Sequence, residues 1–321
     1  MRWLAVIVAS FAAATAARAT PSTPFYAHAT IGHFQGVVAS NGTRYRVAGD
    51  LSFAPDRPAV VAAVGATRLR ITELGGSSRV VATARQTAPP VYGPTNHIAY
   101  AAGTVIRYVG GPTVRATGLP KGARIVQIAM SPDGSTFAAT VEWGNGKAGT
   151  LRNALYFVSP AGTKRIAGPF DGYSTRPSPV WNPQGDKVAY VAVGDVFVVS
   201  SDGSTRTQLS RTPRAIEDRP RWAPDGTQLA YTSGRNGVNE IYVAKLTGGE
   251  RRLTFTKPAP GTTPRIGTQM GAWSPDGSQI AVVTYNSLAV VPAEGGAPEI
   301  VQTFTPSNSV YLGPVAWPVT E

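Results

Sequence analysis

The chain has 321 residues, of which 42% are hydrophobic, so it is long enough to bury a core without disulfide or metal staples. It contains no Cys, which excludes a disulfide framework, a thiolate zinc site, a cysteine nucleophile and a lipoprotein anchor. Its 30 Lys and Arg outnumber its 18 Asp and Glu. The basic residues form no dense run and no aromatic–basic motif, so we expect no nucleic-acid partner.

The first residues have the pattern of a secretory signal peptide. A short basic start, "MR", precedes the apolar stretch "WLAVIVASFAAATA" and the A-x-A cleavage site Ala17-Arg18-Ala19. The apolar stretch is short and rich in small residues, which argues against a membrane span, although a retained anchor is the alternative. No later apolar run could span a bilayer. We therefore predict a signal peptide over residues 1–19, a short linker over 20–24 and an exported mature chain, periplasmic or secreted.

One short phrase recurs along the rest of the chain. Close copies are "MSPDGSTFAATV" from residue 130, "WNPQGDKVAYVA" from 181, "WAPDGTQLAYTS" from 222 and "WSPDGSQIAVVT" from 273. Weaker copies begin at Phe53 and Tyr92, and a truncated copy begins at Trp317. In the close copies a large apolar residue ends one strand, Pro and Gly turn the chain, with Asp between them in three of the four, and a half-buried strand follows. The phrase therefore predicts a repeated β-hairpin.

A second series of turns lies out of phase with the first. Each of its turns follows an apolar strand such as "EIYVAKL" and precedes a more polar strand such as "RRLTF". The series consists of Asn41-Gly42, Gly75-Gly76, Gly110-Gly111, Ala161-Gly162, Asp202-Gly203, Gly248-Gly249 and Gly295-Gly296. One unit is thus strand, Pro-Asp-Gly turn, strand, loop, strand, Gly turn, strand. Repeats of this unit are the signature of a β-propeller with four-stranded blades.

The two turn series predict an all-β, seven-bladed β-propeller. The first Gly turn precedes the first Pro turn, and no Gly turn follows Trp317, so the two ends of the chain are expected to share one blade. There "PVAW" is the inner strand, and "FYAHATI", "FQGVVAS" and "TRYRVAG" are the other three, which removes the open sheet edges. Residues 25–321 then form a single propeller domain. Six blades are the alternative if the N-terminal hairpin is an addition.

Residues 218–255, "DRPRWAPDGTQLAYTSGRNGVNEIYVAKLTGGERRLTF", carry the most family-specific pattern. The segment resembles a repeat of the TolB-type propeller, a WD40-like repeat that runs P-x-W-S-P-D-G, I-A-Y-T-S, I-Y-V, a G-G turn and R-R-L-T. The resemblance is also close at 273–296, looser at 130 and 181, and faint at 53 and 92. It implies the fold and does not specify a function, because the repeat occurs in many exported proteins and in the propellers of prolyl oligopeptidase-like enzymes.

Two departures from the related families bear on function. TolB carries an α/β domain before its propeller, whereas only a few residues separate the predicted signal peptide from the first strand here. We therefore expect a propeller without that domain, which argues against TolB's role as a link in the Tol–Pal system. A prolyl oligopeptidase would need a G-x-S-x-G nucleophile elbow, and the sequence contains none.

The residues with chemical potential are few. The three His are His28, His33 and His97. Some pectin-fragment lyases with TolB-like repeats use a His cluster around a metal, so a meeting of these three at one channel mouth would favour an enzyme acting on a carbohydrate. There is no H-x-H, H-E-x-x-H or acidic calcium-loop pattern. We therefore interpret the His as packing or surface residues and predict no catalytic residue, no metal ligand and no cofactor.

The recurring residues of the phrase are interpreted as structural. Repetition of Asp133, Asp225 and Asp276 argues for turn formation and against catalysis. Trp181, Trp222 and Trp273 are expected to be wedges between blades and not platforms for stacking sugars.

The segments just before the phrase connect one blade to the next and emerge on one face of a propeller. These segments are residues 87–91, 173–177, 217–220 and 265–269. Proteins usually bind their partners through irregular loops on a rigid scaffold. The candidate binding residues are Tyr173, Arg176, Glu217, Asp218, Arg219, Arg265 and Gln269. Their mixed charge suits a polar partner, so we expect a monomer that binds an envelope protein or an anionic glycan. A loop network that satisfies its own charges is the alternative for Glu217 and Asp218.

Overall fold

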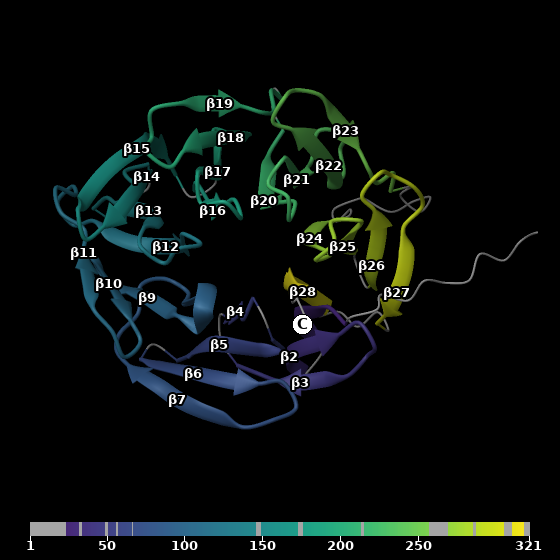
Figure 1. Ribbon diagram of the computed structural model, residues 1–321, viewed down its shortest axis with the longest axis horizontal. Helices are drawn as coiled ribbons and strands as arrows, with labels where there is room; N and C mark the ends of the chain where they lie inside the picture. Colours follow the sequence, from purple (N-terminus) through teal and green to yellow (C-terminus); the bar gives the residue numbers. More distant parts are fainter. Residues whose placement is uncertain are drawn as a thin grey trace, which may run out of the picture.

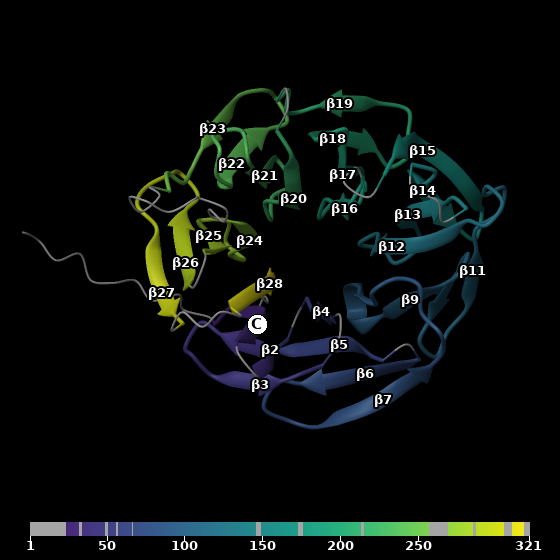
Figure 2. The same cartoon turned by 180° about the vertical axis from the view of Figure 1, so that it is seen from behind.

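Seven four-stranded antiparallel sheets form a closed ring around a central axis (Figures 1 and 2). The computed structural model describes residues 24–31, 34–48, 51–55, 57–65, 67–145, 149–172, 176–212, 215–256, 269–284, 287–304 and 310–317. The predicted seven-bladed β-propeller is confirmed, and the six-bladed alternative is wrong.

The strands of each blade are given in order from the inner to the outer edge. Blade 1 contains β28 (Val310–Ala316), β1 (Tyr26–Ile31), β2 (Phe34–Ala39) and β3 (Arg44–Arg46), and blade 2 contains β4 (Leu51–Phe53), β5 (Ala59–Val64), β6 (Arg68–Glu73) and β7 (Ser78–Thr83). Blade 3 contains β8 (Val91–Tyr92), β9 (Ile98–Ala102), β10 (Val105–Tyr108) and β11 (Thr113–Arg115), with a 3-10 turn, η1 (Pro94–Asn96), between β8 and β9. Blade 4 contains β12 (Arg124–Met130), β13 (Phe137–Trp143), β14 (Arg152–Ser159) and β15 (Gly162–Asp171).

The remaining blades follow the same order. Blade 5 contains β16 (Val180–Trp181), β17 (Lys187–Ala192), β18 (Asp195–Ser200) and β19 (Arg206–Gln208). Blade 6 contains β20 (Glu217–Trp222), β21 (Gln228–Ser233), β22 (Glu240–Lys245) and β23 (Glu250–Arg252), and blade 7 contains β24 (Gln269–Trp273), β25 (Gln279–Val283), β26 (Ser287–Pro292) and β27 (Glu299–Thr303).

Blade 1 closes the ring in the predicted way. Strand β28, from the C-terminal part of the chain, pairs with β1 from the N-terminal part, with Tyr26 opposite Ala316 and Ile31 opposite Val310. The ring of Trp317 lies 5.1 Å from that of Phe25, which is fully buried. The pairing covers the edge of β1 that would otherwise be open at the junction of the two ends.

The hydrophobic core lies at the seams between neighbouring blades. Because both faces of a blade are covered by neighbours, the second and third strands are apolar almost throughout, as in β17 and β22. Outer strands such as β3 and β23 are polar and largely exposed. One cluster of buried residues fills each seam; between blades 5 and 6 it joins Val196 and Val198 to Leu229 and Tyr242.

The repeated Pro-Asp-Gly turns have the expected geometry and role. In the turn after β12, the Gly134 N–H donates to the Ser131 carbonyl oxygen at 2.9 Å, and Gly134 has a φ of +75°, which favours glycine. The Asp133 carboxylate accepts hydrogen bonds from Ser131 and from Ser135, which lower its pKa. Asp225 and Asp276 accept equivalent bonds in their own turns. These carboxylates therefore stabilise the turns.

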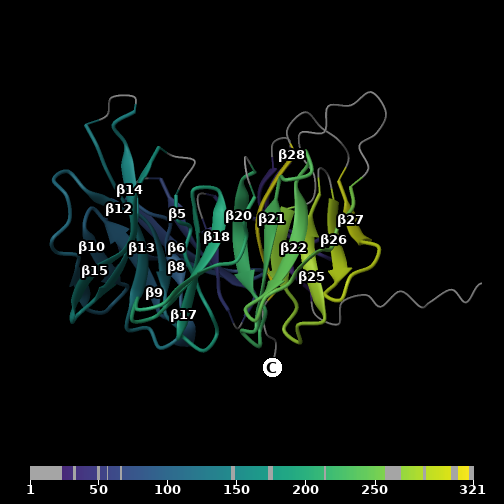
Figure 3. The ribbon, with the colours of Figure 1, turned by 90° about the horizontal axis from the view of Figure 1, so that it is seen from above.

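The strands run between the two faces of the ring, as the side view shows (Figure 3). Antiparallel order places the Pro-Asp-Gly turns and the Gly turns on one face, here called the turn face. The loops between second and third strands and the connections between blades lie on the opposite face, here called the connector face. No helix within the described residues is long and apolar enough to cross a membrane. The predicted signal peptide and most of the predicted linker lie outside those residues.

Candidate functional site

The predicted binding residues lie in four different situations. Tyr173 and Arg265 lie outside the described residues, as does the side chain of Gln269, the first residue of β24. Asp218 and Arg219 form an ion pair at 3.5 Å on the connector side of blade 6. The segment 217–220 belongs to the inner strand β20 and is not a loop. Glu217 and Asp218 pair with β21, and a bulge follows before pairing resumes at Arg221.

Arg176 lies in the connection between blades 4 and 5. Its Nε donates to Oε1 of Glu142 at 2.5 Å, and Arg124 Nη2 lies 3.6 Å from Oε2 of the same carboxylate. Glu142 is buried, with 1% of its side chain exposed, whereas the Arg176 side chain is 40% exposed. Two guanidinium groups on one buried carboxylate leave a net positive charge at this place on the connector side.

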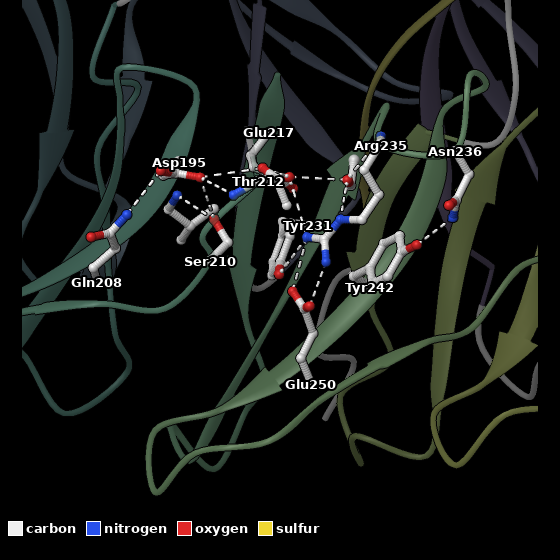
Figure 4. Close-up of polar contacts among 12 residues, drawn as sticks. Asp195, Gln208, Ser210, Thr212, Glu217, Tyr231, Arg235, Asn236, Tyr242 and Glu250 are labelled. Atoms are coloured by element: carbon white, nitrogen blue, oxygen red, sulfur yellow. Dashed lines mark hydrogen bonds and ion pairs between the residues drawn. The ribbon is translucent and has the colours of Figure 1, made fainter. Parts of the chain in front are cut away.

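Glu217 lies inside the protein, at the centre of a polar network between blades 5 and 6 (Figure 4). Its Oε1 accepts hydrogen bonds from Thr212 at 2.7 Å, from Ser233 at 3.0 Å and from Arg235 at 3.2 Å. Burial raises the pKa of Glu217, and these hydrogen bonds and the Arg235 charge oppose that shift. Glu217 therefore stabilises the loops of the connector face through buried hydrogen bonds and is not accessible on that face.

Arg235 joins this network to the outer strand of blade 6. Its guanidinium lies 4.0 Å above the ring of Tyr242 and donates to Glu250, with Nη2 to Oε1 at 3.0 Å. Burial raises the pKa of Glu250 to about 7, and the neighbouring charge of Glu217 adds to the shift. Two carboxylates thus share one cation, as Figure 4 shows for Glu217 and Glu250 on either side of Arg235.

Two further carboxylates fasten the connections between blades to the third strands. Asp195, the first residue of β18, accepts hydrogen bonds from the Thr212 N–H at 3.0 Å and from Gln208. Glu240, the first residue of β22, holds Arg252 Nη2 at 2.9 Å and the Thr256 N–H at 2.6 Å. Asp195 and Glu240 occupy equivalent positions, so the same carboxylate contact to the following connection repeats in neighbouring blades. Our sequence reasoning missed it, although an acidic residue before each of "VFVV" and "IYVA" marks both positions.

Three exposed apolar side chains lie on the connector side of blades 5 and 6. Of the five large hydrophobic side chains exposed among the described residues, Val193, Ile216 and Phe255 lie there, with 73%, 60% and 66% exposure. The Ile216 carbonyl accepts the Gly234 N–H at 3.4 Å, and Gly194 accepts the Glu217 N–H at 2.8 Å, which ties the neighbouring loops together. The other two, Val80 and Ile300, lie on outer strands. We call Val193, Ile216 and Phe255 the apolar trio.

A central cavity of about 1040 Å³ runs between the inner strands. Its walls present apolar and polar surface in similar amounts, and their charged residues in the described part of the chain are Arg176 and Arg221. His28 also lines the cavity, whereas His97 ends η1 on the turn face and packs edge-on against Tyr108. His33 lies outside the described residues. Among the described residues no group of three or more His, Cys, Asp or Glu could hold a metal ion.

These features define a class of protein: a seven-bladed propeller with a cationic central cavity and a charged connector face. The chain belongs to the TolB beta propeller domain family, whose model matches residues 122–293. It is 33% identical over 141 residues to tricorn protease homolog 1 of Streptomyces coelicolor, a match that covers 41% of this chain and 12% of that protein. It is also 33% identical over 127 residues to the protein TolB homolog of Chlorobium luteolum, covering 39% of this chain and 27% of that protein.

Solved structures share the fold at low identity. An oligogalacturonate lyase in complex with manganese has a TM-score of 0.60 and 14% identity, over 90% of this chain and 87% of that chain. A puromycin-hydrolyzing peptidase of Mycobacterium tuberculosis has a TM-score of 0.56 and 17% identity, over 78% of this chain and 46% of that chain. At these identities the likeness concerns the fold alone.

Proposed function

We propose that the mature chain is an exported, non-catalytic propeller that binds a protein partner of the cell envelope through the connector face of blades 5 and 6. The observation that carries the proposal is the apolar trio: three of the five large exposed apolar side chains among the described residues lie on this one face, and exposed apolar groups on one face are a mark of protein interaction sites. The charged pair Asp218 and Arg219 lies on the same side of blade 6 and supplies the polar surroundings typical of such sites.

The network beneath the apolar trio makes this face rigid. Ile216 directly precedes Glu217, which is bonded to Thr212, Ser233 and Arg235. Phe255 lies between Thr254 and Thr256, both held by Glu240. Side chains presented by a fixed backbone lose little conformational entropy on binding. A binding face of this kind requires no catalytic residues.

A glycan partner and a carbohydrate-cleaving activity have weaker support. The His that could contribute to a metal site are separated, with His28 in the central cavity and His97 on the turn face. The indole groups of Trp181, Trp222 and Trp273 donate to main-chain carbonyl oxygens of the preceding blades and act as wedges between them. They are therefore poorly placed to stack on sugars.

The proposal is tested by cross-linked capture from envelope extract with the chain from residue 20 onward. The variant Ile216→Ser with Phe255→Ser removes two members of the apolar trio. The matched control, Val80→Ser with Ile300→Ser, removes two exposed apolar side chains from outer strands. We expect the first variant to lose a protein captured by the parent chain and the control to retain it. Equal capture by both variants, with unchanged thermal unfolding, would contradict the proposal.

A further inference from the structure

The central cavity contains a cation that its surroundings do not neutralise. Arg221 lies on β20 and lines the cavity, and its Nη1 donates to the carbonyl oxygen of the adjacent Pro220 at 2.9 Å. No ion pair joins Arg221 to an Asp or Glu in the described part of the chain. Asp218, on the same strand, is instead paired with Arg219. A partly buried guanidinium without a carboxylate loses solvation and gains little in return.

The rest of the cavity wall adds to the positive potential. The other arginine of the wall, Arg176, shares the carboxylate of Glu142 with Arg124, so this group of three keeps a net positive charge. Asp and Glu are absent from the described cavity lining. Burial lowers the pKa of Arg221, and the charge of Arg219 lowers it further, while Asp218 opposes the shift. An anion bound beside Arg221 would relieve both effects.

The local backbone determines the direction of the Arg221 side chain. The pairing of β20 with β21 is interrupted by a bulge between Asp218 and Arg221. Within the bulge Arg219 has a φ of +54°, a left-handed conformation that is unfavourable for a residue other than glycine. The inner strands β12 and β24 also bulge against their second strands, and Ser178, three residues before Trp181 as Arg219 is before Trp222, has a φ of +45°. The bulge therefore belongs to the repeat, and it redirects the side chains that follow it. Strained backbone of this kind persists where the surrounding structure requires it.

We propose that Arg221 binds a side-chain carboxylate of an acidic peptide segment of the partner protein, which enters the central cavity from the connector face. This inference rests on the proposed partner-binding function and names the chemistry of its recognised segment. The guanidinium supplies charge-assisted hydrogen bonds to the carboxylate. The apolar part of the wall, with Val126, Ile128 and Val180, contacts aliphatic side chains on either side of it.

A peptide fits this cavity better than an anionic glycan. Sugar recognition relies on polar side chains and open aromatic faces. Of the polar side chains of the wall, Ser52 already accepts the Tyr92 N–H and Asn182 the Lys187 N–H. The indole N–H of Trp181 donates to the Ala129 carbonyl oxygen, and that of Trp222 donates to Val180. The hydroxyl of Tyr92 accepts from Arg57 at 2.7 Å. The polar parts of these aromatic side chains are therefore already engaged within the protein.

The test measures binding of a capped peptide of alternating Leu and Glu by calorimetry, with the mature chain at low ionic strength. Arg221→Gln should weaken binding by on the order of tenfold or more, because a hydrogen bond between charged groups is lost. Arg221→Lys should restore part of the affinity. The matched control is Arg165→Gln, which removes an exposed arginine from the outer strand β15 and should leave affinity unchanged. The Gln counterpart of the peptide should bind at least tenfold more weakly than the Glu peptide.

Three results would overturn the inference. They are no binding of the Glu peptide at millimolar concentration, equal affinity of the parent and the folded Arg221→Gln variant, and tighter binding of trigalacturonate than of the Glu peptide. Thermal unfolding checks that the variants are folded. Failure here is distinct from failure of the proposed function. If partner capture depends on Ile216 and Phe255 but not on Arg221, the proposed binding face stands and the proposed recognition of an acidic segment is wrong.

Discussion

The indole Nε1 of Trp222 donates a hydrogen bond to the main-chain carbonyl oxygen of Val180, 3.1 Å away in the preceding blade. The same bond recurs from Trp181 to Ala129 and from Trp273 to Arg221, each at 3.1 Å. Each indole therefore buries its ring in a seam while its polar atom is satisfied by the neighbouring inner strand. Successive blades are joined by a bond that has the same geometry at each of these seams.

Replacing Trp222 by Phe keeps an aromatic ring in the seam but removes the donor to Val180. We expect the free energy of unfolding to fall by about 1–3 kcal/mol, since the buried carbonyl is left without its partner. The measurement is the urea midpoint for unfolding of the chain from residue 20 onward. Trp143→Phe is the control, because Trp143 packs in the seam of blades 3 and 4 and its indole has no hydrogen-bond partner in the described part of the chain. A loss no larger than that of the control would contradict this account of the hydrogen bond.

Ring closure depends on β28 and on Trp317, which is buried against Phe25. Ending the chain after Gly313 removes the part of β28 that pairs with Tyr26 and Ala27, together with Trp317. Loss of Trp317 alone should cost about 3–5 kcal/mol, so we expect a clear drop in the thermal unfolding temperature. Ending the chain after Trp317 is the control and should leave that temperature close to the parent value. A truncation after Gly313 that melts like the parent would argue against closure by these strands.

Glu250 should give the protein a pH-dependent stability. Its pKa is raised from 4.5 to about 7 in the folded state, so between these values the folded chain binds a proton that the unfolded chain has released. Protonation therefore stabilises the fold fully below pH 4.5, and this contribution is lost as the pH rises to about 7. The expected slope is at most about 1.4 kcal/mol per pH unit.

The measurement is the free energy of unfolding across this pH range for the parent and for Glu250→Gln. The variant carries a permanently neutral side chain and should show a smaller fall with rising pH. Glu299→Gln is the control, since Glu299 lies on the outer strand β27 of another blade. Identical pH profiles for the parent and Glu250→Gln would show that Arg235 keeps Glu250 ionised throughout.

Much of the architecture follows from the sequence alone, for a local physical reason. The Ser-Pro-Asp-Gly turns are determined by their own residues. Pro sets one φ, Asp133 accepts hydrogen bonds within the turn, and Gly134 adopts a positive φ. Turns at a regular spacing determine where strands begin and end, and their number determines the number of blades. The unmatched turns at the two ends of the chain likewise predict the strand composition of blade 1, which the pairing of β1 with β28 confirms.

The site depends on contacts between residues that are distant in the sequence. Glu217 and Asp218 are neighbours in the chain, yet one is fully buried and the other is exposed, because side chains alternate along β20. The partner of Arg176 is Glu142 in the preceding blade, and nothing in the residues around either one indicates the pairing. The position of Arg221 in the cavity depends on the bulge in β20 and on the inner strands of the other blades. Local chemistry thus determined the turns and the repeat, whereas strand register and ring closure, which bring together groups far apart in the chain, decided which charges are neutralised and which face the cavity.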